Sequence, residues 1–377
     1  RLLSRGLGDV YKRQPLLGDP SSAAISLSGE YELGRLWLSV FRSSVKEYED
    51  PLTTTYLEDL IYRISETSEV RDRRYEFVII DDESINAFAA PGGIIGVNKG
   101  MFLKTDFESE FASVMCHELA HLSQRHFARS QSQMTALGNA LLILGSVAVA
   151  AASGSPEGIY LGPALIQQLS INYTRSNERE ADRIGFNNLV RAGFDPKGMS
   201  SMFQKLQKSR GNNDEEYSYL MSHPLPKERI TDARLRESEI EKENEYRDSL
   251  DFYLIKARSI VSSSSNVRDL VKEYQNILSS NLDQKSIIAA EYGLVLSYKK
   301  LKNFPVAFKA LRNLLDQLPD NLIFQTTLME LHLAEENNFE AVSVGETLLG
   351  LNQDNYAISK ILARAYLQNN QPKDAEG

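Results

Sequence analysis

The stretch VMCHELAHLSQRHF, residues 114–127, contains the pattern His-Glu-x-x-His at positions 117–121. Its apolar residues recur at helical spacing, which predicts an amphipathic helix. Residues i and i+4 share a helix face, so His117 and His121 can reach one ion. Glu118 would lie beside that ion, where it can take a proton from bound water. The pattern predicts a catalytic zinc site; the alternative is a surface helix that carries two histidines by chance.

A catalytic zinc needs a third protein ligand and an open position. The segment NEREAD, residues 177–182, offers Glu178 as that ligand, on a second helix predicted over 165–191. Asp182, one turn further, can accept the free N–H of a ligand histidine and orient its ring. Glu180 would point elsewhere on the helix. The alternative for such a charged stretch is a solvated helix face.

Two residues of SHPLPKERI, 222–230, are further candidates. His223 can be a fourth zinc ligand that blocks the water position, an oxyanion contact, or a surface residue in a loop. Arg229 can stabilise an anion, or form a salt bridge to Glu178 or Asp182. His126 is expected to be structural, and Cys116, the only cysteine, to lie in the core. With one cysteine, a closed structural zinc site is disfavoured.

The flanking segments predict a mainly helical domain with a small sheet. Residues 28–70 are expected to be helical, YEFVII at 75–80 to be a strand, and the chain around Pro91-Gly92-Gly93 to be a hairpin. Thr105 and Glu108 fit a capping box that starts the His-Glu-x-x-His helix. The apolar run 136–152 is shorter than the roughly 20 residues of a bilayer span. It is expected to be a buried or lid-forming helix, or a segment that touches a membrane surface.

The C-terminal part has a different pattern, with a period of 34 residues. Four columns repeat at this spacing, and LPDN at 318–321 is echoed by NQDN at 352–355. A period of 34 with alanine at a fixed position is typical of tetratricopeptide repeats, which stack helix pairs into a protein-binding solenoid. The columns are Leu294, Leu328 and Leu362; Tyr298, His332 and Tyr366; Ala307, Ala341 and Ala375; Leu314 and Leu348.

The net charge restricts the kinds of partner that the protein can bind. The net charge of −9 argues against a nucleic-acid partner, since phosphate binding needs a basic face. We expect a non-native segment at 1–14, a metalloprotease domain at 15–245 and truncated repeats at 251–377. The chain is expected to be a fragment at both ends.

The ordered motifs NAFAAPGG, SVMCHELAHLSQRH, NEREADRIG, GFDP and SHPLPKERI resemble the HtpX-like family of HExxH zinc peptidases. With the repeats, the chain is similar to the group of that family that serves outer-membrane protein assembly. The resemblance implies a gluzincin-type α+β protease domain before a helical repeat solenoid, in the periplasm of a Gram-negative bacterium. It also implies one Zn²⁺ per chain on His117, His121 and Glu178, Glu118 as base, and His223 as a gate.

Two functions follow as hypotheses. The first is a zinc endopeptidase that binds its substrate as an added strand along Asn86–Ala90 and hydrolyses misfolded or stalled outer-membrane β-barrel proteins. Its repeats would contact these clients or their assembly machinery. The second is mainly a chaperone or scaffold, in which His223 keeps the zinc site largely silent.

Overall fold

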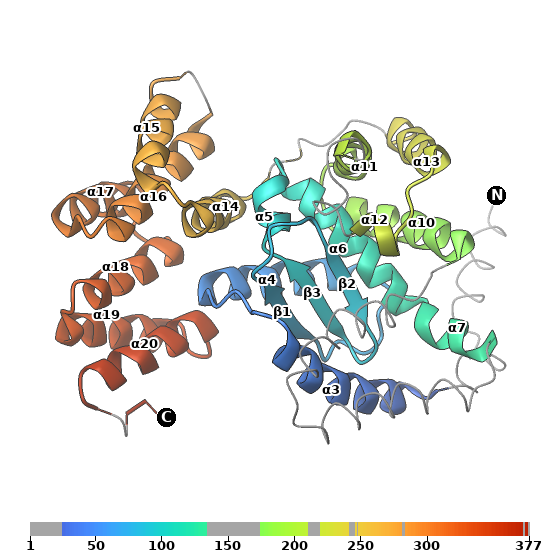
Figure 1. Cartoon of the computed structure of the whole chain (residues 1–377), viewed down its shortest axis with the longest axis horizontal. Helices are drawn as coiled ribbons and strands as arrows, with labels where there is room; N and C mark the ends of the chain where they lie inside the picture. Colours follow the sequence, from blue (N-terminus) through green and yellow to red (C-terminus); the bar gives the residue numbers. More distant parts are fainter. Residues whose placement is uncertain are drawn as a thin grey trace, which may run out of the picture.

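The structure is a computed structural model and describes residues 25–133, 174–209, 219–240, 246, 248–280, 283–371 and 374–375. A mainly helical part with one small sheet precedes a run of paired helices (Figure 1). The predicted fold class, α+β followed by a helical repeat array, is therefore confirmed. The segments 1–14 and 136–152 lie outside the described residues, and the proposed domain boundaries stay predictions. No helix within the described ranges is long and apolar enough to cross a membrane.

The sheet has three strands in the order β1-β3-β2: β1 (Glu76–Ile80), β2 (Ala87–Ala90) and β3 (Ile94–Asn98). The predicted hairpin is the antiparallel pair of β2 and β3, and β1 runs parallel to β3. Gly92 and Gly93 turn the hairpin with φ of 80° and 79°, a conformation that side chains with a Cβ rarely adopt. Strand β2 is thus an edge of the sheet, and it lies next to the helix that carries His117.

Residues 28–70 are mainly helical, as predicted, but they form two helices. The segment forms α3 (Leu27–Ser44) and α4 (Pro51–Glu66), with an extended connection between them. That connection pairs with the outer edge of β1, where the Tyr48 amide donates to the Ile79 carbonyl at 2.7 Å. Pro51 stands at the first position of α4, where a missing N–H costs nothing. Pairing with the sheet and a proline start therefore separate the helical segment into two helices.

The His-Glu-x-x-His helix is α6, in the series α5 (Gly100–Lys104), α6 (Glu108–Ser123) and α7 (His126–Gln133). Every residue of α6 from 108 to 121 is buried. The predicted capping box is wrong. The Thr105 hydroxyl donates to the Met101 carbonyl at 2.7 Å, and Glu108 accepts from the Tyr56 hydroxyl at 2.9 Å. In a helix this deeply buried, the Glu108 carboxylate accepts hydrogen bonds from other segments instead of from the backbone N–H groups at the start of the helix.

Helices from the second half of the protease part surround α6. Helices α10 and α11 pack along α6, and α13 packs on both of them (Figure 1). The helix predicted over 165–191 is described from its N-cap Thr174, whose hydroxyl accepts from the Asn177 amide at 3.2 Å. This arrangement brings residues about 60 and 110 positions downstream against the His-Glu-x-x-His motif. The bounds are α10 (Arg175–Arg191), α11 (Lys197–Ser209), α12 (Tyr219–Ser222) and α13 (Lys227–Ser238).

The repeat period reappears as pairs of antiparallel helices. Ala307 and Ala341 are fully buried at the helix contacts, as the small-residue column predicts. Asn321 and Asn355, 34 residues apart, each cap a helix by accepting an amide N–H at 3.0 Å. The array comprises α14 (Leu250–Ser263), α15 (Val267–Leu278), α16 (Gln284–Lys300), α17 (Phe304–Gln317), α18 (Leu322–Ala334), α19 (Asn338–Leu351) and α20 (Tyr356–Gln368).

The turns inside the repeats also recur at this spacing. Lys302, Glu336 and Asn370 each have positive φ, at 57°, 67° and 57°, directly after the first helix of a pair. A left-handed residue there ends one helix and reverses the chain into the next. His332 packs its ring against Phe308, with 4.9 Å between centroids, in keeping with the packing role expected of its column.

The repeat array contacts the protease part at a buried ion pair. Arg258 of α14 donates to both oxygens of Asp50, the N-cap of α4, at 2.8 Å each. The same guanidinium donates to Glu330 of α18 at 2.8 Å. Helix α20 packs against α4 as well, so the array meets the protease part at both its ends.

Candidate metal centre

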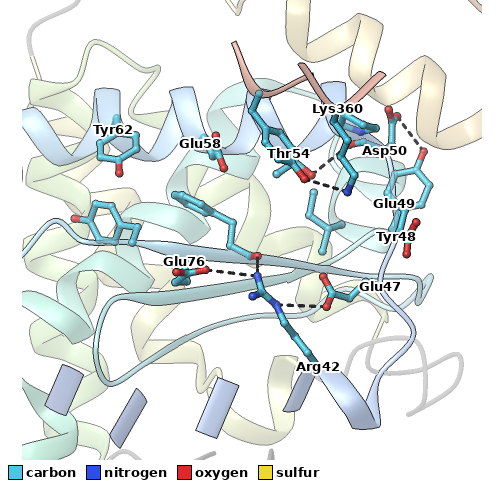
Figure 2. A pocket seen from close by; sticks show the side chains of 15 residues that line it. Arg42, Glu47, Tyr48, Glu49, Asp50, Thr54, Glu58, Tyr62, Glu76 and Lys360 are labelled. Carbon is cyan, nitrogen blue, oxygen red and sulfur yellow. Dashed lines mark hydrogen bonds and ion pairs between the residues drawn. The ribbon is translucent and has the colours of Figure 1, made fainter. Parts of the chain in front are cut away.

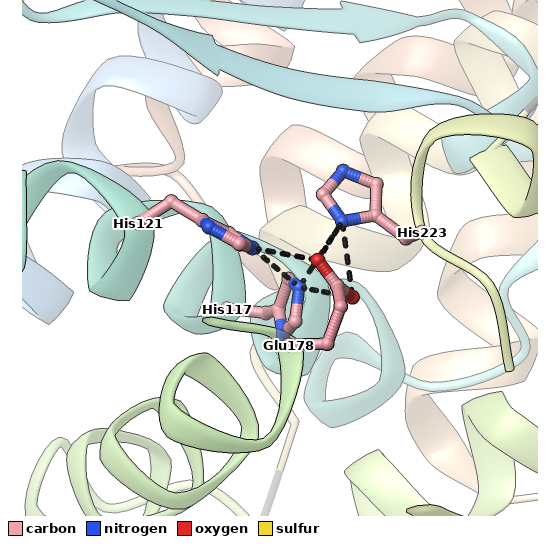
Figure 3. Close-up of side chains that lie close together, drawn as sticks. All are labelled: His117, His121, Glu178 and His223. Carbon is pink, nitrogen blue, oxygen red and sulfur yellow. Dashed lines mark hydrogen bonds and ion pairs between the residues drawn. The ribbon is translucent and has the colours of Figure 1, made fainter. Parts of the chain in front are cut away.

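Four buried side chains from three elements meet at one point (Figure 3). His117 and His121 come from α6, Glu178 from the first turn of α10, and His223 directly follows α12. One ligand atom from each lies within 4.8 Å of the other three. Each residue is only 2% exposed. A site this enclosed needs a compensating charge or strong hydrogen bonds, because unpaired buried polar groups are costly.

The spacing of the donor atoms fits a small tetrahedral ion. Bonds of about 2.0–2.1 Å place tetrahedral ligand atoms roughly 3.3–3.4 Å apart. The His117 Nε2 atom lies 2.9 Å from His121 Nε2 and 3.3 Å from His223 Nδ1. The Glu178 Oε1 atom lies 3.4 Å from His121 Nε2 and 3.1 Å from His223 Nδ1. Three imidazoles and a carboxylate suit zinc, so the residues present fit the metal that the motif implies.

The second helix reaches α6 because of a close backbone approach. A Cβ built on Gly185 of α10 would lie 3.0 Å from the Cys116 carbonyl oxygen and from the His117 amide nitrogen. Glycine therefore sets the separation of α10 from α6. The two turns before it carry Glu178 and Asp182 directly over the histidines. Cys116 is fully buried, as predicted.

Asp182 lies where a carboxylate can orient His117. Its Oδ1 atom is 3.0 Å from His117 Nδ1. Burial alone would lower the pKa of His117, but hydrogen bonds with Asp182 and Glu178 raise it to about 9. Burial dominates at His121 and lowers its pKa well below the usual value, so that ring is neutral.

Arg229 neutralises both carboxylates from behind. Its guanidinium donates to the two Asp182 oxygens and to Glu178 Oε2, each at 2.7 Å, and to the Pro224 carbonyl at 2.8 Å. These are the salt-bridge contacts given above as the alternative to anion stabilisation. Burial raises the pKa of Asp182, but the Arg229 charge and the His117 hydrogen bond outweigh it and the pKa is lowered. These contacts hold Glu178 and Asp182 in place, and anion stabilisation by Arg229 stays a prediction.

Glu118 lies on the side of the cluster that faces strand β2. Its Oε2 accepts from the Ala89 amide at 3.1 Å, and its Oε1 accepts from the Tyr219 hydroxyl at 3.2 Å. Burial raises the pKa of Glu118 above its ordinary value, which makes the carboxylate a better proton acceptor. Its assignment as general base stays a prediction.

His223 contacts both the other members of the cluster and Glu118. Its Nδ1 faces Glu178, while its Nε2 is 3.5 Å from Glu118 Oε1. The Tyr219 ring stacks on it with centroids 4.5 Å apart. The surface-loop interpretation is wrong, because α12 and the SHP turn fold inward over α6. Whether His223 binds the metal or the oxyanion stays a prediction.

Two contacts of the cluster had no functional assignment from sequence. Tyr219 contacts Glu118 and His223, and nothing in its local sequence marks it. His126 lies beside His121, with 2.8 Å between their Nδ1 atoms. Its position five residues after a predicted ligand was a usable signal, because the next helical turn can return to the same ring.

A hollow of about 330 Å³ lies elsewhere, between β1, α4 and α20 (Figure 2). Its lining includes Tyr356 and Lys360 from the repeat array and Glu58 and Tyr62 from α4. None of the four clustered ligand candidates lines it, so it is separate from the metal centre. It is a contact region between the two parts of the chain.

A helix with His-Glu-x-x-His, a glutamate from a second helix and an adjacent edge strand define an HExxH metallopeptidase. Residues 51–237 match the profile described as Peptidase family M48. The chain belongs to peptidase family M48 and is a metallopeptidase.

Similarity to known proteins extends beyond the protease part of the chain. The chain is 32% identical to the "Beta-barrel assembly-enhancing protease" of Escherichia coli (strain K12), with 96% of this chain and 74% of that protein covered. The protein of the same name from Yersinia pestis is 31% identical, with 99% and 77% covered. The "Metalloprotease LoiP" of Escherichia coli (strain K12) is 28% identical over 157 residues, or 41% of this chain and 60% of that protein. The first two likenesses therefore include the repeats.

Proposed function

We propose that this M48 peptidase is a periplasmic zinc endopeptidase that hydrolyses misfolded or stalled outer-membrane β-barrel proteins. The observation that carries the enzymatic part is the buried cluster of His117, His121, Glu178 and His223 beside Glu118. The client class rests on likeness to two relatives named for β-barrel assembly, which match 99% and 96% of this chain, its repeats included. The repeats would hold the client or the assembly machinery.

In this proposal His117, His121 and Glu178 hold one zinc ion, which supplies a Lewis acid and an acidified water. Glu118 takes the proton of the attacking water, and its raised pKa suits that task. The substrate adds as a strand along the β2 edge, where the Ala89 amide now donates to Glu118. His223 must leave the donor set before water and substrate enter, which makes it the gate.

Replacement of Glu118 with glutamine tests the mechanism. The amide keeps the size and a carbonyl acceptor but cannot take a proton, so zinc should stay bound while cleavage of a misfolded barrel protein is lost. Metal content by elemental analysis and cleavage by gel would be measured together. Cleavage at the unaltered rate would refute Glu118 as base, and lack of zinc in the unaltered protein would refute the metal centre.

A second candidate function is a chaperone or scaffold with a largely silent site. The position of His223 among the donors favours it, since a fourth protein ligand leaves no place for water. A groove of about 570 Å³ on the repeats, between α17 and α18, carries Lys309 and Arg312. Charge reversal of these two should impair barrel assembly in cells if binding dominates. If only Glu118→Gln impairs assembly, proteolysis dominates.

A further inference from the structure

His126 is a fully buried histidine that no step of the proposed mechanism uses. It begins α7, and its ring stands edge-on to that of His121, with centroids 4.9 Å apart and planes at 74°. The two Nδ1 atoms are 2.8 Å apart. On the far side of the ring, His126 Nε2 is 3.1 Å from Glu180 Oε2, which also accepts from Arg129 Nη1 at 2.9 Å. A chain of contacts thus runs outward from His121.

The hydrogen-bonding capacity of imidazole fixes where the protons of this chain lie. The Nε2 atom of His121 faces the donor set and needs its lone pair to bind a metal, so a neutral His121 carries its proton on Nδ1. That proton is donated to His126 Nδ1, which must then be an acceptor. The proton of His126 is therefore on Nε2 and is donated to Glu180, whose charge Arg129 balances. One tautomer at each ring is consistent with the contacts from His121 to His126 and from His126 to Glu180.

The turn between α6 and α7 places the ring. Helix α6 ends at Ser123, and Arg125 takes a left-handed conformation with φ of 50°. The Arg125 side chain donates to Glu30 at 3.1 Å and also to the Ile25 carbonyl, so α3 holds the turn from outside. The chain reverses at this point, and His126 returns against the ring one turn back in α6.

The two histidines of the motif are thus supported by different means. His117 contacts a carboxylate directly, that of Asp182. On the side of His121 that faces away from the cluster, its Nδ1 contacts a second imidazole, that of His126, which in turn contacts the carboxylate of Glu180. In both cases an arginine balances the outer carboxylate, Arg229 in the first and Arg129 in the second. The same physical requirement, a fixed tautomer and a fixed ring plane, is met twice.

We infer that His126, backed by Glu180, is a positioning residue that holds His121 in the tautomer and orientation that bind the metal. The inference rests on the proposed role of His121 as a ligand. Outer partners of ligand histidines typically change metal affinity by about 10–100-fold when removed. His126 would touch neither substrate nor metal.

A pair of nearly isosteric variants tests this inference in the full chain. His126→Asn keeps an oxygen acceptor near the Nδ1 position, whereas His126→Leu removes the acceptor that lies 2.8 Å from His121 Nδ1. Zinc affinity would be measured by competition with a chromogenic chelator, and the visible spectrum of the Co²⁺ form would report the geometry. We expect about 10–100-fold weaker binding and an altered spectrum for leucine, and affinity close to that of the unaltered protein for asparagine.

Controls separate this inference from the proposed function and from folding damage. His332→Leu, in the repeats, should leave zinc affinity unchanged. Glu180→Leu removes the outer acceptor at a partly exposed position and should also weaken binding, so it serves if His126→Leu does not fold. If the unaltered protein binds zinc and either His126→Leu or Glu180→Leu binds it with equal affinity, the inference about His126 is refuted and the proposed function is not. Failure of the unaltered protein to bind zinc would overturn the proposed function.

Discussion

Replacement of Arg229 with methionine should destabilise the metal-free protein more than any exposed arginine would. The side chain is 3% exposed and makes three hydrogen bonds of 2.7 Å to the carboxylates of Asp182 and Glu178. Methionine fills much of the volume but leaves both carboxylates buried without their cation. Removing one partner of a buried pair costs about 3–5 kcal/mol, because the remaining charge keeps its desolvation penalty.

That cost converts to a measurable shift in the melting temperature. For a domain of 150–250 residues, 1 kcal/mol is worth about 2–4 °C, so the variant should melt roughly 6–20 °C lower at pH 7. Saturating zinc should recover part of the loss, since a bound cation neutralises Glu178 but does not touch Asp182. The lowered pKa of Asp182 determines how the stability difference between the variant and the unaltered protein changes with pH. The stability it contributes is present above its unfolded pKa and is lost as the pH falls through its folded pKa, so the difference should shrink in acid.

The assay is calorimetry or circular dichroism of the chelator-treated and the zinc-loaded protein. Arg234→Met is the matched control, because Arg234 lies on the same helix, is exposed, and makes no salt bridge or side-chain hydrogen bond with any residue that the structure describes. It should change stability by less than about 0.5 kcal/mol. A loss for Arg229→Met that equals that of the control, or that zinc does not reduce, would refute the argument from buried charge.

Three further outcomes are expected. Arg258→Met should cost about 3–5 kcal/mol by leaving Asp50 buried without its cation, and should expose α14 to proteolysis; unaltered melting would contradict this. Gly185→Ala should destabilise, because overpacking against backbone costs about 1–3 kcal/mol against about 1 kcal/mol of helix propensity gained. Gly350→Ala, with nothing within 4 Å, should not destabilise; equal effects of the two substitutions would disprove the close-approach argument. Zinc affinity should rise about tenfold per unit from pH 7 to 9 as His117, with a pKa of about 9, gives up its proton; a flat profile would argue against this.

Local sequence patterns were poor guides where contacts with distant segments competed with the local interactions. Thr105 and Glu108 have the spacing of a capping box, yet Glu108 bonds to Tyr56 from another helix. The helical pattern over 28–70 is interrupted because the residues before Pro51 pair with β1. In each case the competing interaction comes from a distant segment, which no local pattern encodes.

The sequence alone determined what depends on short spacing or on repetition. Two histidines four residues apart share a helix face in any context, and a 34-residue period with fixed small residues forces stacked helix pairs. The tertiary structure decided which distant groups complete the site. The sequence predicts that Glu178 joins these rings. The inward turn of His223 and the contacts from His121 through His126 depend instead on how α7, α10 and α12 pack around α6. Packing across large sequence separations follows from the sum of many weak contacts, so no single motif specifies it.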